Sequence, residues 1–311
     1  MKRDRNDLVE TIILGILGSL VVLTLTAPQL LQDRSPPPLL SLSILLRDTD
    51  SSGWTVARQG MEQAADELGA ELRFLTLTAQ NDSEEQTAVL FREIDGGADA
   101  LVVVPAGPDE LTLALSQRPD HCPVVTLEST VEGAAGIVAP ADEEVGRRLA
   151  LALLEDWTGG PVLLLDPLPQ TGIGARAEGA RAALEERGVP VRRAAALPQD
   201  GPEERWVMAF EPLATQQAAE RKEAEELGFA LYGVGSGTAI TAQLERGNIS
   251  ALAAWSDYAA GYLAVRQAVE AAMRADRQDP GPLAFSIVRG EDIYAPENQK
   301  LLFPIMSSSG R

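Results

Sequence analysis

Cysteine and histidine are almost absent from this chain, which has one of each, Cys122 and His121, in 311 residues. A single cysteine excludes a disulfide within the chain, and one cysteine with one histidine cannot build a Cys/His zinc cluster. A Ser-His-Asp triad would depend on His121, which lies in a predicted loop before a strand. We therefore expect no catalytic residue and no metal site.

Basic residues are also scarce, because 26 Lys and Arg face 46 Asp and Glu, for a net charge of −20. Affinity for nucleic acid rests on neutralising phosphates with Lys and Arg, so this balance predicts no nucleic-acid partner. An acidic surface of this kind is typical of a well-solvated protein. The length and the apolar fraction of 45% predict about two domains with sizeable cores.

Charge is missing altogether from residues 11–32, a nearly continuous apolar stretch. It is long enough to cross a bilayer of about 30 Å, so we interpret it as a transmembrane anchor in the lipid bilayer. Lys2, Arg3 and Arg5 precede it, and acidic neighbours count little in the positive-inside rule. This predicts a cytoplasmic N-terminus over 1–10 and an extracytoplasmic remainder.

A cleaved signal peptide is the alternative interpretation of the same stretch. Ala27 is a small residue suited to a cleavage site, but Pro28 directly after it is a poor context, and the uncharged stretch exceeds a typical signal core. We favour an uncleaved anchor. Residues 33–40 contain three prolines in a row, which predict a short, stiff linker to the next domain.

Apolar strand-like runs alternate with amphipathic helical patterns from residue 40 onward. Apolar residues recur at helical spacing from Ala57 to Leu68, and Gly69 follows as a helix stop. Other helices are predicted over 83–95, 108–117, 141–157, 173–188, 213–227, 238–246 and 257–275. Strands are predicted over 40–46, 71–78, 98–105, 122–128, 134–140, 161–166, 189–196, 205–210, 229–235 and 249–255.

Strands this apolar, separated by helices, predict parallel sheets covered on both faces. Two consecutive units of this kind predict an α/β fold with two similar doubly wound lobes. Ligands of open α/β sheets bind beyond the carboxyl ends of the strands, so two facing lobes share one cleft. Asp48 and Asp50 follow the first strand and are interpreted as turn residues lining it.

Two glycine-rich segments do not predict a cofactor site. Residues 172–177 match G-x-G-x-x-A, but six residues with two prolines separate them from the preceding strand, which a dinucleotide fingerprint should follow at once. Residues 232–238 lack the lysine of a phosphate-binding loop, and their glycines suit a tight turn instead. We expect no cofactor and no enzymatic activity.

Six segments occur in a characteristic order along the chain, and they are "ARQGMEQAADELGAEL", "EIDGGADALVVVPAG", "CPVVTLES", "GIVAPADEEVGRRLA", "RAEG" and "ERGNISALAAWS". Together they resemble the type I periplasmic solute-binding proteins, in the sugar-binding group typified by ribose- and galactose-binding proteins. The similarity spans about residues 41 to 290. The resemblance implies two lobes joined by a three-crossover hinge that closes on a ligand. It places 41–139 plus 256–283 in the N-terminal lobe and 140–255 plus 284–311 in the C-terminal lobe.

The resemblance also implies roles for particular residues. An aromatic at the first strand–helix turn of the family stacks on the sugar ring, and Trp54 occupies that position. Trp255 takes the place of a common Gln on the hinge strand, so we expect the ligand between the two indoles. The full set of predicted ligand-binding residues is Asp48, Asp50, Ser51, Trp54, Glu128, Arg176, Glu211, Ser236, Trp255 and Asp257.

The sequence departs from the family in several places. Ser129 replaces the Arg that follows the acidic residue, and Gly235 stands where the family has a hydroxyl-binding Asp. Only 197–204 separate two strands where the family has a full helix, and a parallel crossover usually needs a dozen residues or more. We expect the second lobe to lack one helix or to rearrange locally, and a missing helix would leave part of a sheet face uncovered.

The sequence thus predicts a non-enzymatic, membrane-anchored, extracytoplasmic solute-binding protein with one N-terminal transmembrane helix. It would close on a small polar ligand, a sugar, for uptake or sensing, with a membrane permease or sensor as partner. The alternative is a degenerate binding fold that acts as a protein-interaction or sensor module without sugar transport.

Overall fold

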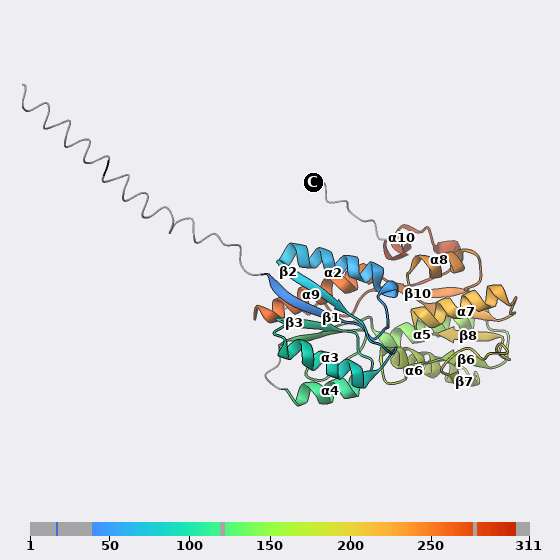
Figure 1. Cartoon of the computed structure of the whole chain (residues 1–311). Helices are drawn as coiled ribbons and strands as arrows, with labels where there is room; N and C mark the ends of the chain where they lie inside the picture. Colours follow the sequence, from blue (N-terminus) through green and yellow to red (C-terminus); the bar gives the residue numbers. More distant parts are fainter. Residues whose placement is uncertain (1–16, 18–38, 119–121, 276–278, 303–311) are drawn as a thin grey trace, which may run out of the picture. The chain divides into compact units, whose positions relative to one another are not determined.

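The computed structural model describes residues 17, 39–118, 122–275 and 279–302. Over these residues the chain forms two β-sheets, and helices cover both faces of each sheet (Figure 1). The chain divides into Met1–Leu39 and Leu40–Arg311, and both sheets belong to the second unit. Among the described residues, no helix has the length and apolarity that a bilayer crossing needs. The predicted anchor apart from Leu17, the residues before it, most of the linker and His121 lie outside the described residues.

The first lobe is built on a parallel sheet in the order β2-β1-β3-β4-β5. Every residue of β3 and β4 is buried, because helices cover both faces of the sheet. This explains why these strands read as continuous apolar runs. The strands are β1 (Leu40–Leu45), β2 (Ala70–Leu75), β3 (Ala100–Val103), β4 (Val124–Leu127) and β5 (Gly136–Val138).

Helices α2 (Thr55–Leu68) and α9 (Asp257–Ala272) cover one face of the first sheet, and α3 (Ser83–Asp95) and α4 (Pro108–Ser116) cover the other (Figure 1). The 3₁₀ turn η1 (Ser52–Trp54) leads into α2, and Gly69 ends α2 in the left-handed conformation as predicted.

The second lobe contains a sheet in the order β11-β10-β9-β8-β6-β7, parallel except for β11, which runs antiparallel to β10. Its strands are β6 (Val162–Leu165), β7 (Val191–Ala194), β8 (Trp206–Ala209), β9 (Ala230–Val234), β10 (Ala251–Trp255) and β11 (Phe285–Val288). One face packs against α5 (Asp142–Asp156) and α6 (Gly172–Glu185), and the other against α7 (Pro212–Ala224), α8 (Thr238–Glu245) and α10 (Pro296–Leu302).

In the described part of the chain, the backbone passes between the lobes three times, after β5, after β10 and before β11. The first and third passages lie side by side, because Leu283 N donates to Ala139 O at 2.9 Å. The prediction of an α/β fold with two parallel-sheet lobes is therefore confirmed. Because the parallel strands of each sheet share one direction, all their carboxyl ends lie at one edge.

The last elements of the chain escaped sequence prediction. β11 is a short strand of four residues with only Val288 buried, and the 3₁₀ turn η2 (Gly290–Asp292) separates it from α10. An edge strand this short has neither the apolar run nor the alternation that marks a strand. It is recognised only through its pairing with β10.

The connection between β7 and β8 has no helix, as predicted, but the predicted uncovered sheet face is wrong. Leu163, Leu165 and Val207 point to that face and are at most 1% exposed. The loop 195–205 covers them, with Leu197 packed on the core and Arg192 paired with the buried Glu204. A hydrogen-bonded loop thus takes the place of the missing helix.

Arg221 of α7 fastens this loop, since its guanidinium donates to Pro198 O at 2.9 Å and to Gln199 O at 2.8 Å. We expect Arg221→Met to lower the free energy of unfolding by about 1–3 kcal/mol, because carbonyl groups of the loop lose their charged donor. Thermal unfolding measures the loss. Arg246→Met, which removes only an exposed pair with Glu223, is the control and should cost under about 1 kcal/mol. Equal losses would show that the loop does not depend on Arg221.

Candidate functional site

Charged side chains from both lobes meet where the strands end. Arg47 follows β1, Glu128 follows β4, and Glu211 follows β8 of the opposite lobe. Arg47 Nη1 donates to Glu128 Oε2 at 2.5 Å, and Nη2 donates to Glu211 Oε1 at 3.2 Å. The Arg47 side chain is 3% exposed and those of Glu128 and Glu211 are 15% and 9% exposed, so this bridge between the two lobes is largely shielded from water.

Burial and charge compete at these three groups. Burial opposes the charge of Arg47, but Glu128 and Glu211 hold its pKa above the ordinary value. Burial would raise the pKa of Glu128, but the charges of Arg47 and Arg176 outweigh it and lower that pKa. At Glu211 burial prevails over Arg47 and the pKa is raised. We conclude that Glu128 is the more firmly ionised of the two carboxylates.

The backbone at Glu128 is unusual, because its φ of 67° lies in the left-handed region that disfavours residues with a Cβ. Such strain persists only where surrounding contacts fix it, and it is common at ligand sites. Here Gly172 approaches so closely that a Cβ on it would lie 2.2 Å from Glu128 O. The N–H of Gly172 donates to Ser129 Oγ at 3.0 Å, which adds a second polar contact between the lobes.

Arg176 of α6 forms the second charged centre. Its Nε donates to Asp142 Oδ1 at 2.7 Å, its Nη1 donates to Phe210 O at 2.9 Å, and its guanidinium lies 4.7 Å from the ring centre of Trp255. The side chain is fully buried, and burial raises the pKa of Asp142 to about 6. Arg176 therefore ties α5, β8 and β10 together at the carboxyl edge of the second sheet.

Asp257, at the start of α9, makes a third contact between the lobes. Ser236, which follows β9, donates from Oγ to Asp257 Oδ2 at 2.6 Å. Burial raises the pKa of Asp257 to about 6, and the nearby charge of Glu128 adds to the shift. Its charge and those of Glu128 and Arg176 are thus close enough to influence one another.

Trp54 lies on the first lobe, beside the charged cluster made by Arg47, Glu128, Glu211, Arg176, Asp142 and Asp257. Its Nε1 donates to Asp48 Oδ2 at 2.7 Å, and its half-buried ring packs against the core under α2. Asp48 also accepts from Gln80 and is near enough to Arg47 and Glu211 for its charge to raise the pKa of both. The hydrogen bond to Asp48 fixes the orientation of the indole.

The structure brings together most of the residues that the sequence predicted. Glu128 and Glu211 share Arg47, Arg176 lies against Trp255, and Ser236 donates to Asp257. The charges of Glu128, Arg176 and Asp257 influence one another, and Asp48 and Trp54 lie beside them. Asp50 and Ser51 make none of these contacts. Asp50 is exposed and accepts from Ser52 N at 2.7 Å, so the structure gives both residues a role in the turn that leads into η1. Their contact with a ligand stays a prediction.

Trp255 was predicted to face the ligand opposite Trp54, and that contact stays a prediction. Trp255 is 5% exposed, packs in the core of the second lobe, and faces the guanidinium of Arg176. Arg47 and Asp142 were missed. Arg47 ends an apolar strand run, which is a usable signal, whereas nothing in the sequence of the helix start distinguishes Asp142 from its acidic neighbours.

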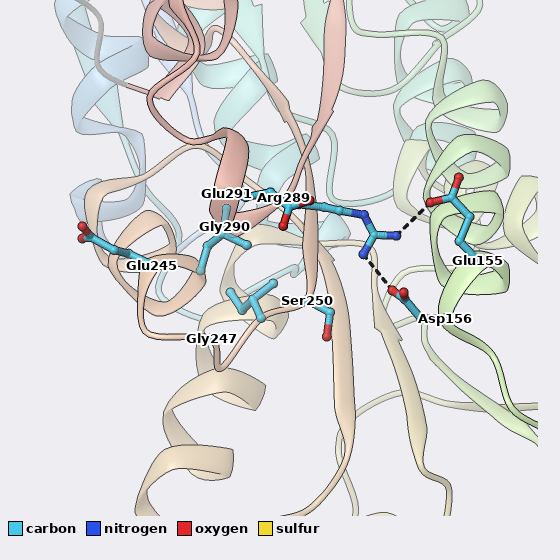
Figure 2. Close-up of a pocket in the computed structure, with 10 residues that line it drawn as sticks. Glu155, Asp156, Glu245, Gly247, Ser250, Arg289, Gly290 and Glu291 are labelled. Atoms are coloured by element: carbon cyan, nitrogen blue, oxygen red, sulfur yellow. Dashed lines mark hydrogen bonds and ion pairs between the residues drawn. The ribbon is translucent and has the colours of Figure 1, made fainter.

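A separate pocket of about 510 Å³ lies at the other end of the second sheet, where Ser250 precedes β10 (Figure 2). Glu155 and Asp156 on its wall pair with Arg289 at 3.0 and 2.7 Å, as Figure 2 shows. The protein thus supplies a counter-charge of its own there. Among the described residues, no group of three or more His, Cys, Asp or Glu side chains is placed to hold a metal ion.

Known proteins resemble this chain both in sequence and in structure. A family profile described as a periplasmic binding protein domain matches residues 42–275. The ribose import binding protein RbsB of Bacillus subtilis is 30% identical over 104 residues, which are 33% of this chain and 33% of that protein. The matched stretch thus spans about a third of that relative.

Solved structures resemble the whole two-lobed unit. A carbohydrate transporter solute-binding protein of Agrobacterium radiobacter, in complex with D-arabinose, has a TM-score of 0.76 at 17% identity and covers 86% of this chain and 99% of its own. The XylFII–LytSN complex contains a chain with a TM-score of 0.70 at 14% identity, covering 82% of this chain and 100% of its own. At such identities the likeness shows the fold alone.

Proposed function

Because the chain belongs to the periplasmic binding protein domain family, a family of non-enzymatic solute-binding proteins, we propose that it binds a small polar, sugar-like ligand between its two lobes. The match confirms the family predicted from the sequence. The single observation that carries the proposal is the cluster of Arg47, Glu128, Arg176 and Asp257 at the facing carboxyl edges of the sheets. Ligands of open α/β sheets bind at such edges.

The chemistry of the cluster suits a polyhydroxylated ligand. A hydroxyl group both donates and accepts, so it can bind a carboxylate and a guanidinium side by side. Trp54 supplies an apolar ring next to these groups, and such a ring suits the C–H face of a sugar. Trp255 is buried against Arg176, so we retain Trp54 alone as the stacking residue.

The proposal predicts stabilisation by ligand. The full-length protein, purified in mild detergent, should gain roughly 5–10 °C in Tm with one class of sugar or polyol at about 100 times Kd, because the ligand binds only the folded form. A panel of pentoses, hexoses, inositols, nucleosides and amino acids, read by differential scanning fluorimetry, is the test. No shift with any compound would contradict the proposal.

Trp54→Ala should weaken binding of the active compound at least tenfold, because the ligand loses its stacking surface. Trp54→Phe should retain most of the affinity. Trp157→Ala removes an indole that bonds to Gly160 O outside the cluster and should leave Kd unchanged. Titration calorimetry measures all three. Equal affinities for Trp54→Ala and the wild type would exclude Trp54 from the site.

We also propose that the protein works outside the cytoplasm, held to the membrane by residues 11–32, and passes its ligand to a permease or reports it to a sensor. Tethering would raise the effective concentration of the binding protein near a membrane partner. Carbonate extraction of membranes tests the anchor. Wild type should stay in the pellet and a variant lacking 1–35 in the supernatant, and release of the wild type would contradict an uncleaved anchor.

A second candidate function is a protein-interaction or sensor module without transport. Arg47 favours it, since its guanidinium occupies two carboxylates that a sugar could otherwise use. The XylFII–LytSN complex has the same fold in an assembly of two proteins. An empty ligand panel, together with co-purification of a membrane sensor that survives Trp54→Ala, would favour this function over the first.

A further inference from the structure

The two arginine side chains of the cluster are more deeply buried than its carboxylates. The Arg47 and Arg176 side chains are 3% and 0% exposed, whereas those of Glu128 and Asp142 are 15% and 12% exposed. Asp257 is half-buried. The carboxylates therefore lie nearer to solvent than the two guanidinium groups do.

The charges of the cluster do not balance. The guanidinium groups of Arg47 and Arg176 pair with the carboxylates of Glu128, Glu211 and Asp142. Asp257 and Asp48 add two further carboxylates within electrostatic reach. Arg47 is shared by Glu128 and Glu211, and Arg176 pairs with Asp142. The described residues give Asp257 one side-chain hydrogen bond, from the hydroxyl of Ser236, and no ion pair.

A half-buried carboxylate with only a hydroxyl partner is costly, because a neutral donor does not repay the loss of hydration. The raised pKa of Asp257, about 6, reflects this cost. Near neutral pH the group is still mostly ionised. A cation beside the carboxylate would offset this cost, because the attraction between opposite charges is strong where the local dielectric constant is low.

Two buried donors point to the rest of the ligand. Arg47 Nε and Arg176 Nη2 have no hydrogen-bond partner among the described residues, and both side chains are more than nine-tenths buried. An unsatisfied buried donor costs about 1–3 kcal/mol, so each favours an acceptor oxygen from a bound molecule. Hydroxyl oxygens are such acceptors.

We propose, on the basis of the proposed function, that the ligand is an amine-bearing polyol, such as an amino sugar, whose ammonium group binds Asp257 and whose hydroxyl groups accept from Arg47 and Arg176. Asp257 is then the residue that selects the amine. Ser236 orients its carboxylate through the 2.6 Å hydrogen bond.

Matched pairs of probes test the proposal by titration calorimetry of the full-length protein at pH 7. The pairs are glucosamine with glucose, galactosamine with galactose and mannosamine with mannose, and the N-acetylated sugars keep the bulk of the substituent without its charge. We expect at least one amino sugar to bind tenfold or more tightly than both its neutral parent and its N-acetylated form.

Variants assign the preference to Asp257. Asp257→Asn should weaken binding of the amino sugar at least tenfold and change the affinity for the neutral parent less than threefold. Ser236→Ala keeps the carboxylate and should keep the preference. Asp66→Asn, which alters an exposed carboxylate on α2 outside the site, is the matched control and should change nothing.

Different results would contradict the preference for an amine and the proposed binding function. If neutral sugars bind as tightly as their amino forms, this inference is wrong and the proposed function stands. If no probe binds and the wider panel is also empty, both are wrong. Should Asp257→Asn fail to fold, the tenfold preference of the wild type decides the question by itself.

Discussion

Replacing Arg47 with alanine is expected to lower the free energy of unfolding by about 3–5 kcal/mol, because the change leaves two buried carboxylates without their cation. Glu128 and Glu211 come from opposite lobes, so the loss also removes an attraction that holds the lobes together. The corresponding fall in Tm is roughly 5–9 °C for a chain of this size. Scanning calorimetry at pH 7.5 measures it.

The loss should shrink at pH 5. We expect the loss of Arg47 to raise the pKa of both carboxylates, because its charge opposes the effect of burial at each of them. They should then take up protons in the folded state at pH 5, which removes the repulsion between them. A group with a raised folded pKa contributes stability at low pH that is lost as pH rises through that pKa. A loss in Tm that is the same at pH 5 and pH 7.5 would contradict this explanation.

Two further variants separate charge from packing at this position. Arg147→Ala removes an exposed pair with Glu144 and should cost under about 1 kcal/mol. Arg47→Met combined with Glu128→Gln and Glu211→Gln removes every charge of the bridge and should recover most of the stability. If Arg47→Ala unfolds at the wild-type temperature, the bridge does not stabilise the contact between the lobes.

Gly146→Ala should cost about 3 kcal/mol, because a Cβ at this position would lie 1.7 Å from Arg176 O and 2.6 Å from Arg176 C. Both are backbone atoms of α6, so α5 and α6 must separate. Intrinsic propensity predicts the opposite sign, since alanine in a helix interior is favoured over glycine by about 1 kcal/mol. The sign of the change in calorimetric Tm therefore shows whether the close contact with α6 or the helix propensity of alanine dominates.

The same packing recurs in the first lobe. A Cβ on Gly261 of α9 would lie 1.9 Å from Ala57 O of α2, so Gly261→Ala should be similarly destabilising. Gly228→Ala is the control, because no atom lies within 4 Å of its added Cβ. A Gly146→Ala protein as stable as the wild type would show that the helices separate freely, and that Arg176 is not fixed by them.

The local patterns of the sequence were sufficient for most elements of the fold. β3 and β4 are continuous apolar runs because both faces of their sheet are covered, and Gly69 marks the end of α2 by its conformation. β11 was missed because pairing with β10, rather than its own pattern, makes it a strand. The covered sheet face near 195–205 was missed because Arg221 and Leu197 act across distant parts of the chain.

The contacts of the candidate site were predicted less completely. Glu128, Glu211 and Asp257 were selected because they follow strands or begin a helix, and they do lie among the charged groups where the lobes meet, while their contact with a ligand stays a prediction. Arg47, the shared partner of Glu128 and Glu211, was not predicted, because its bridge to Glu211 joins residues 164 positions apart and depends on how the lobes meet. The roles of Trp255 and Asp142 depend in the same way on Arg176, which no local pattern connects to either residue.

The most direct measurement captures the ligand itself. Full-length protein is incubated with a small-molecule extract of the cells that produce it, washed, denatured and analysed by mass spectrometry, beside the Trp54→Ala variant. Our account predicts that wild type retains a polyhydroxylated compound in near-equimolar amount and that the variant loses it. Retention of no compound by the wild type, or of the same amount by both proteins, would contradict binding between the lobes.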